Sequence, residues 1–326
     1  MHSPRCWYKG KSRGWHYKSM SQSVRFSILF SILAFSATLV VICKGWTGQD
    51  TWYAEAPGLT ELGKQKRYTI VVNTFKRHDL LKRSLEHYGH CNRADAIRVQ
   101  WSEADPPPAD VASFLTADRG MPGSDDSVEV KFDVHLEDSL NNRFKPLPDV
   151  RTEAIFSVDD DLLVPCETLE FAFELWTSAP DQLVGFVPRM HWRKKHSTPA
   201  EYSYGGWWSV WWTGRYSMIL TKAAFLHHKY FEQYTNELPR EIFAYAHKAR
   251  NCEDIAMSFL VANQTGAPPL WVKGAFSEIG SYGISSLGNH QQRRSECLNQ
   301  FHRIYGYMPL IEGHVKAVQA VRDWFW

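Results

Sequence analysis

The first 49 residues contain no acidic side chain, and residues 26–43 contain no charged side chain at all. This uncharged stretch reads FSILFSILAFSATLVVIC, which is eighteen residues long. As a helix rising about 1.5 Å per residue it would span roughly 27 Å, close to the thickness of a bilayer core. Its four hydroxyl side chains can bond back to the helix backbone. The stretch is therefore predicted to be a single transmembrane helix.

The missing acidic residues leave the N-terminal flank strongly basic. Its basic residues are Arg5, Lys9, Lys11, Arg13, Lys18 and Arg25. Only Lys44 follows the apolar stretch directly, so residues 1–25 are expected in the cytosol and the rest of the chain in a lumen. A cleaved signal peptide is the alternative, although no small-residue cleavage site follows. A buried core helix is a third interpretation, disfavoured because every face is apolar.

The chain also lacks a strong net charge, the formal value being +2. Six of the 37 basic residues belong to the tail, which leaves 31 against 35 acidic residues in the remainder. This balance excludes a nucleic-acid binder that acts through charge. Internal repeats, low-complexity segments and linker-like composition are absent as well, so we expect one continuous domain over residues 67–326, preceded by a stem over residues 44–66.

Cysteines are few, and two of the six, Cys6 and Cys43, belong to the predicted tail and membrane helix. The other four are Cys91, Cys166, Cys252 and Cys297. An oxidising lumen favours disulfides, but four cysteines allow three full pairings and the sequence does not choose among them. Asn263 begins the one glycosylation sequon, consistent with a lumenal domain.

Short β-branched runs alternate with helical patterns in the first half of the predicted domain. Strands are predicted over 67–75, 96–101, 128–134, 154–158 and 183–187, and helices over 78–88 and 168–176. This alternation predicts an α/β fold with a mostly parallel sheet. In the second half we expect an aromatic loop or hairpin over 202–212, a strand-to-helix stretch over 216–227 and largely helical structure over 230–262.

Three consecutive aspartates, Asp159 to Asp161, follow the predicted strand 154–158. Ligands of α/β proteins bind at the carboxyl ends of strands. Three adjacent carboxylates at such a place call for a cation, and hard oxygen ligands suit Mg²⁺ or Mn²⁺ bridged to substrate phosphates. The simpler alternative is a solvated acidic turn or helix cap.

Other charged residues have less specific patterns. Glu253 and Asp254 precede an apolar helical run, where the helix dipole alone explains two carboxylates. Arg77, Arg143 and Arg294 suit bidentate phosphate contacts, with an ordinary surface position as the alternative for each.

Taken together, the motifs resemble the exostosin-type glycosyltransferases, family 64. The matching stretches run in order over roughly residues 67 to 310 and include VVNTFKRHDLL, SLNNRF, AIFSVDDDLLVP, FAFELW, DQLVGFVPR, YSMIL, NCEDIAMSFLVA, RSECLNQF and YGYMPL. The resemblance implies a GT-A fold and a metal-dependent transfer of a sugar from a nucleotide-sugar with retention of configuration.

The resemblance also implies roles for single residues. Asp161 matches the metal-binding carboxylate, and Asp159 and Asp160 match contacts to the ribose and sugar of the donor. The other implied substrate-binding residues are Asn73, Arg77, Asp138, Asn142, Arg143 and Glu253. Asp254 matches a carboxylate beside the anomeric carbon, which would act in a front-face displacement or as the nucleophile of a double displacement. Arg294 matches an arginine that grips the diphosphate, and a Cys252–Cys297 disulfide would tie these last two segments together.

Within the family, the single-domain length and the stretch YSYGGWWSVWW are most similar to plant members that mannosylate glycosyl inositol phosphorylceramide. This similarity implies GDP-mannose as donor, a membrane glycolipid as acceptor and a Golgi lumenal location. Hexosamine-transferring members carry Gln at the position of Asn73 and Asn at those of Ser102 and Asp138, which fits a change of donor.

Two other functions remain open. One is a hexosaminyltransferase using UDP-GlcNAc or UDP-GalNAc on glycans or glycolipids. The other is a non-catalytic lectin or scaffold, against which the joint presence of Asp161, Asp254 and Arg294 argues. The pairs Trp207-Trp208 and Trp211-Trp212 have three interpretations, namely core packing, a membrane interface, or stacking on acceptor sugars.

Overall fold

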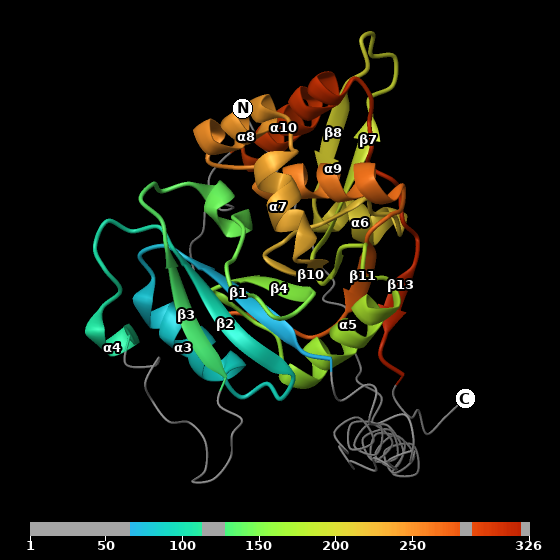
Figure 1. The fold of residues 1–326 in the computed structure, drawn as a ribbon. Helices are drawn as coiled ribbons and strands as arrows, with labels where there is room; N and C mark the ends of the chain where they lie inside the picture. The colour runs from blue at the N-terminus through green and yellow to red at the C-terminus, as the bar shows by residue number, and fades with distance from the viewer. Residues whose placement is uncertain (1–65, 113–127, 281–288, 321–326) are drawn as a thin grey trace, which may run out of the picture. The chain divides into compact units, whose positions relative to one another are not determined.

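An eight-stranded mixed sheet forms the centre of the protein (Figure 1), in the order β13-β11-β6-β10-β4-β1-β2-β3. The computed structural model describes residues 66–112, 128–280 and 289–320, all within one compact unit. The strands are β1 (Tyr68–Thr74), β2 (Ala94–Trp101), β3 (Glu129–Val134), β4 (Ala154–Asp159), β6 (Val184–Gly185), β10 (Ala223–His227), β11 (Leu270–Lys273) and β13 (Lys316–Val318). Neighbouring strands run parallel except at β10, which is antiparallel to both β4 and β6. The predicted α/β fold with a mostly parallel sheet is confirmed.

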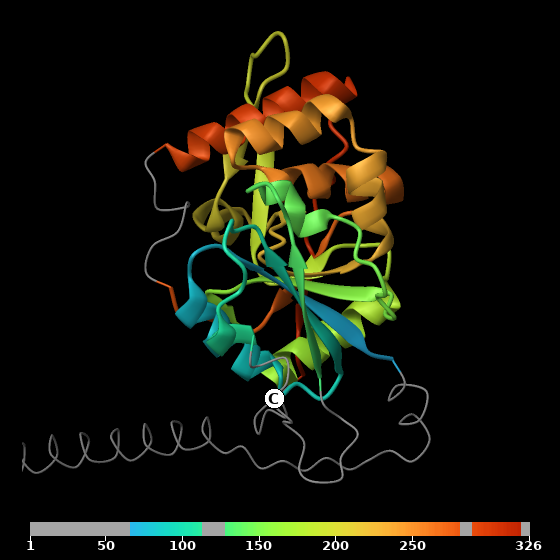
Figure 2. The same cartoon turned by 60° about the vertical axis from the view of Figure 1, so that its left-hand side comes forward.

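Helices cover both faces of this sheet (Figure 2). On one face lie α3 (His78–Tyr88) and α5 (Cys166–Ser178). On the other lie α7 (Lys229–Asn236), α8 (Arg240–Ala249), α9 (Glu253–Thr265) and α10 (His290–Tyr305). Shorter helices are α4 (Ala109–Ala112), the 3-10 helix η2 (Leu140–Phe144) and α6 (Trp207–Thr213).

Side-chain alternation along the central strands builds two separate cores. In β1, Val71 packs with α7 to α10, whereas Ile70 and Val72 pack with α3 and α5. In β4, Ile155 and Phe156 divide between the cores in the same way. Because successive side chains of a strand point to opposite faces, an uninterrupted apolar run marks a strand that is buried on both sides. This burial is why the patterns 67–75 and 154–158 match β1 and β4 so closely.

Two segments of the second half differ from the prediction. Residues 202–212 form β8 (Tyr202–Gly205) followed by α6, not a loop or hairpin, and Gly206 separates the two elements. Residues 216–227 form β9 (Met218–Ile219) and β10 with no helix between them. Tertiary pairing decides both cases, since β8 and β9 flank β7 (Pro188–Arg193) and β10 fills the gap between β4 and β6. The remaining small sheet pairs β5 (Leu162–Leu163) with β12 (Ser277–Glu278).

The described part of the chain contains no helix that is long and apolar enough to span a bilayer. The predicted membrane helix, residues 26–43, lies outside the described residues, as do the tail and nearly all of the stem. Those parts of the chain remain predictions.

A buried histidine on β7 couples stability to pH. His191 Nδ1 lies 2.7 Å from Ser217 Oγ, and burial lowers the pKa of His191 to about 4, while nearby Glu312 acts in the opposite direction. Between pH 4 and about 6.5 the unfolded chain therefore binds a proton that the folded protein does not, so folding stability falls as pH falls.

We expect His191→Gln to remove this contribution. Lowering the pH from 7.5 to 4.5 should reduce the free energy of unfolding of wild type by about 2 kcal/mol more than that of the variant, as measured by urea unfolding. If the difference in free energy of unfolding between the two proteins stays the same across this pH range, His191 titrates normally in the folded state.

Candidate active site

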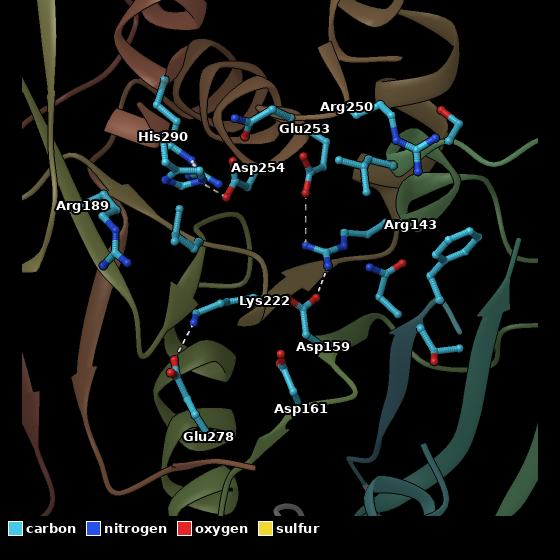
Figure 3. Close-up of a pocket in the computed structure, with 18 of the residues that line it drawn as sticks. Arg143, Asp159, Asp161, Arg189, Lys222, Arg250, Glu253, Asp254, Glu278 and His290 are labelled. Carbon is cyan, nitrogen blue, oxygen red and sulfur yellow. Dashed lines mark hydrogen bonds and ion pairs between the residues drawn. The ribbon is translucent and has the colours of Figure 1, made fainter. Parts of the chain in front are cut away.

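A cavity of about 720 Å³ opens at the carboxyl ends of β1 and β4. Its floor carries Asp159 and Asp161 at the end of β4, and its opposite wall carries Glu253 and Asp254 from the start of α9 (Figure 3). The volume suits a ligand of nucleotide-sugar size. The topology places the site here because parallel strands end at one common edge of the sheet.

The three aspartates do not act alike, because their side chains alternate. Asp159 and Asp161 line the cavity, whereas Asp160 is 0% exposed and points away from it. Asp160 Oδ2 accepts a hydrogen bond of 2.6 Å from the Thr74 hydroxyl. Burial raises the pKa of Asp160 to about 7, against the opposing effect of Arg77. Asp160 lies in the turn after β4 and is buried against Arg77, so the structure does not bring it to the cavity as the implied contact with the donor requires.

Arg77 neutralises the carboxylates on this floor. Its guanidinium lies 2.5 Å from Asp160 Oδ1 and 2.7 Å from Asp161 Oδ2. Its place just ahead of α3 brings it beside the end of β4. Arg77 lines the cavity, as the nucleotide-pocket role requires, and it also holds Asp161 in place.

Arg143 joins the floor to the opposite wall. It is buried, forms an ion pair with Asp159, and its Nη1 lies 3.6 Å from Glu253 Oε1 (Figure 3). When the amide oxygen and nitrogen of Asn73 are exchanged, which is the orientation that satisfies both atoms, the oxygen accepts a hydrogen bond from Arg143 Nη2 at 2.6 Å. Burial, and then the charge of Asp254, raises the pKa of Glu253. Arg143 therefore fixes the spacing of the two acidic groups across the cavity.

Asp254 forms an ion pair with Arg294 on the wall that faces the aspartates of the floor. Arg294 Nη1 lies 3.0 Å from Asp254 Oδ2, and the same guanidinium donates to the Tyr204 hydroxyl at 3.1 Å. The Cys252–Cys297 disulfide joins the residue before α9 to the middle of α10, the two helices that carry this pair, as the resemblance implied. Cys252 has a left-handed backbone, φ 74°, in the tight turn ahead of α9. The pairing left open by the sequence is completed by Cys91–Cys166, away from the cavity.

Two other predicted binding residues have different surroundings. Asn142 does not line the cavity, because its amide donates to Ser102 Oγ at 2.9 Å and to the Glu137 carbonyl at 2.6 Å. It supports the wall instead of meeting a ligand. Asp138 does line the cavity, and its Oδ2 lies 2.6 Å from Arg250 Nη2.

Several cavity residues were missed by sequence reasoning. They are Arg189, Tyr204, Lys222, Arg250, Glu278 and His290. Lys222 Nζ lies 2.7 Å from Glu278 Oε1 beside the aspartates, although 56 residues separate the two in sequence. Three of them had a signal in the sequence, because Arg189 ends the matching stretch DQLVGFVPR, Tyr204 lies in YSYGGWWSVWW, and Lys222 follows YSMIL by two residues. The others come from separate elements that only the fold brings together.

The donor set suits a divalent cation that shares its ligands with a substrate. Among the described residues, no group of three or more acidic, histidine or cysteine side chains is close enough to hold a metal by itself. Asp161, with Asp159 beside it, nevertheless presents hard carboxylate oxygens to the cavity. One or two carboxylates with phosphate oxygens and water are the usual ligands of Mg²⁺ in such sites. The residues present therefore fit a metal carried with a diphosphate.

The four tryptophans of α6 are exposed, so core packing is wrong for them. Trp208 and Trp212 are 75% and 81% exposed, and Trp207 and Trp211 are exposed as well. Val210 is the α6 side chain that enters the core.

An α/β sheet with paired carboxylates and arginines around a nucleotide-sized cavity is suited to bind a phosphorylated ligand. The family model of the glycosyl transferase family 64 domain matches residues 68–322. The chain therefore belongs to glycosyltransferase family 64 and is a glycosyltransferase.

Several relatives share most of this chain. The glycosylinositol phosphorylceramide mannosyl transferase 1 of Arabidopsis thaliana is 47% identical over 311 residues, covering 94% of this chain and 91% of the relative. Exostosin-like 2 of Mus musculus is 33% identical, covering 77% of this chain and 76% of its own. The glucosamine inositolphosphorylceramide transferase 1 of Oryza sativa subsp. japonica is 32% identical, and the match covers 90% of this chain but 37% of that longer protein.

Proposed function

We propose that this enzyme transfers mannose from GDP-mannose to a glycosyl inositol phosphorylceramide, with retention of configuration and with Mn²⁺ or Mg²⁺. The observation that carries the proposal is the 47% identity to the Arabidopsis mannosyl transferase across 94% of the chain. The lining of the cavity adds support, since Asn73, Ser102 and Asp138 all lie there. These are the positions at which the family resemblance associates other side chains with hexosamine donors.

We further propose a GT-A fold, supported by the mixed sheet and by carboxylates placed directly after β4. In this fold Asp161 would hold the metal, which supplies positive charge to the diphosphate leaving group. Asp159 and Arg143 would position the donor next to it. Arg77, which is ion-paired with Asp161, would also contact a phosphate of the bound donor.

We favour the front-face route over a double displacement. Asp254 is 3% exposed and its Oδ2 is ion-paired with Arg294, so this oxygen is a poor nucleophile. A carboxylate held in that way is suited to stabilise positive charge at the anomeric carbon. The acceptor hydroxyl would then attack on the face that the leaving group departs from, with its proton passing to a phosphate oxygen.

Asp254→Asn tests this role. We expect kcat to fall by about 10²- to 10³-fold, because the charge facing the transition state is lost, while the affinity for GDP changes little. Transfer kinetics and calorimetric titration with GDP measure the two quantities. A wild-type protein mass raised by one hexosyl group after donor alone would contradict the front-face route and identify a covalent intermediate.

The donor is tested with the purified full-length chain and Mn²⁺, supplied in turn with GDP-mannose, UDP-GlcNAc, UDP-GalNAc and UDP-glucose. Turnover of GDP-mannose above the others supports the proposal. Preference for a UDP-hexosamine would support the second candidate, a hexosaminyltransferase, which the 32% identity to the rice glucosamine transferase favours.

We also propose that the protein is a single-pass type II protein of the Golgi membrane with its catalytic unit in the lumen. Supporting this are the apolar stretch 26–43, the two disulfides, and the exposed position of Asn263 near the end of α9. Glycosidase treatment of the cellular protein should lower its apparent mass, and Asn263→Gln should abolish that shift. An unglycosylated, protease-accessible catalytic unit in sealed Golgi vesicles would refute the orientation.

A further inference from the structure

The α6 tryptophan patch, made of Trp207, Trp208, Trp211 and Trp212, is an exposed apolar surface with a regular geometry. At about 100° per residue, these four positions fall within an arc of roughly 140° on one face of the helix. Val210, buried in the core, lies on the opposite face. The helix is thus anchored by one small side chain and directs four large ones outward, the reverse of an ordinary surface helix.

The patch is continuous rather than scattered. Trp208 and Trp211 have ring centroids 5.7 Å apart, and Trp211 and Trp212 6.2 Å. Trp207 meets Trp271 edge to face at 5.8 Å. Exposed apolar surface of this extent marks an interaction site.

The patch adjoins the mouth of the active site. Gly206 and Trp207 both line the cavity, while Trp208, Trp211 and Trp212 do not. A partner on the patch would therefore lie next to the bound substrates without filling the place of the donor.

Three basic side chains lie on segments that adjoin the patch. Arg215 is two residues past the end of α6, Lys316 lies 5.1 Å over the Trp271 ring, and exposed Arg193 follows Trp192, whose ring packs over Gly205. The acidic Glu312 on this side is paired with Arg215 at 3.3 Å. Tryptophan with flanking cations is the side-chain set that prefers the headgroup region of an anionic bilayer.

The proposed membrane anchor would also keep the patch near a bilayer. The predicted membrane helix ends at residue 43 and β1 begins at Tyr68. The connecting chain spans at most about 85 Å when fully extended.

We infer that the α6 tryptophan patch docks the catalytic unit onto the membrane surface, so that the cavity faces the headgroup of its lipid acceptor. The inference rests on the proposed function for the identity of that acceptor. Docking replaces a three-dimensional search by one within the membrane plane and presents the acceptor sugar to the mouth of the cavity.

The test uses the full-length chain reconstituted in phosphatidylcholine vesicles with about one fifth phosphatidylserine. The variant carries Trp208→Ser, Trp211→Ser and Trp212→Ser, and leaves Trp207 in place. The control carries Val134→Ser and Leu136→Ser, which remove exposed apolar side chains from the other end of the sheet order. Lipids brominated on the acyl chains report insertion through quenching of tryptophan fluorescence.

We expect the brominated lipids to quench a fraction of the tryptophan fluorescence of wild type and control, and to quench none of this fraction in the triple variant. In the variant, kcat/KM for the acceptor lipid in vesicles should fall at least about tenfold, while that for its soluble, delipidated headgroup stays within about twofold. Equal quenching in wild type and variant would overturn the inference. If kcat/KM of the variant falls as much for the soluble headgroup as for the lipid, the inference is also overturned and the tryptophans are assigned to stacking on the acceptor sugars.

Two further outcomes distinguish membrane docking from self-association and from a different acceptor. A change from dimer to monomer in the variant, seen by sedimentation in detergent, would identify the patch as a contact between copies and overturn the inference. If wild type transfers nothing to the lipid, the proposed function fails by itself, and the quenching comparison still decides whether the patch docks.

Discussion

Asp161→Ala should lower the kcat for sugar transfer by about 10³-fold, equivalent to about 4 kcal/mol of transition-state stabilisation. The carboxylate lines the cavity just after β4 and is the one that we propose to hold the cation. Without it the proposed cation would lose the carboxylate that holds it beside the leaving group. Initial rates at increasing Mn²⁺ concentration measure the effect, and the variant should not recover at saturating metal.

A binding measurement separates loss of metal from loss of fold. GDP with Mn²⁺ should raise the melting temperature of wild type and leave that of Asp161→Ala unchanged, because a ligand that binds the native state stabilises it. Asp105→Ala, an exposed aspartate outside the cavity, is the matched control and should behave as wild type. Full activity of Asp161→Ala would remove the metal site from this position.

Removing the Cys252–Cys297 disulfide should destabilise the protein by about 4 kcal/mol and also lower its activity. The sequence separation is 45 residues, and the stability figure follows from the chain entropy released in the unfolded state. The loss of activity has a different cause, because the bond holds Asp254 and Arg294 at 3.0 Å across two helices. Urea unfolding and transfer rates of Cys252→Ser/Cys297→Ser measure the two effects.

The second disulfide provides the control. Cys91–Cys166 has a sequence separation of 75 residues and lies outside the cavity. Its removal should lower stability by a similar amount, about 4 kcal/mol. The folded fraction should keep its kcat. If both double variants lose activity equally at a temperature where each is folded, the Cys252–Cys297 bond has no special part in positioning the site.

The sequence specified the first half of the fold in detail. The helix predicted at 78–88 has the observed bounds, and the strands predicted at 67–75 and 154–158 agree within two residues, because continuous apolar runs belong to strands buried on both faces. The observed strand β6 is shorter than the predicted strand 183–187, because only Val184 and Gly185 pair with neighbouring strands.

Local patterns were insufficient where a segment depends on a distant partner. The stretch 216–227 has helix-forming side chains, yet β10 inserts antiparallel between β4 and β6 and adopts their extended backbone. Tertiary pairing regularly overrides weak local propensity in this way. The aromatic stretch 202–212 likewise changes from strand to helix at Gly206.

By itself, the sequence determined the α/β class, the family and the aspartates after β4, because strand periodicity and short motifs are local properties. Only the tertiary structure decided that Asp160 turns inward, that Asn142 supports the wall, that Lys222 meets Glu278, and that the α6 tryptophans face outward. Side-chain direction and long-range contact depend on how distant segments pack against one another, and no local pattern records that packing.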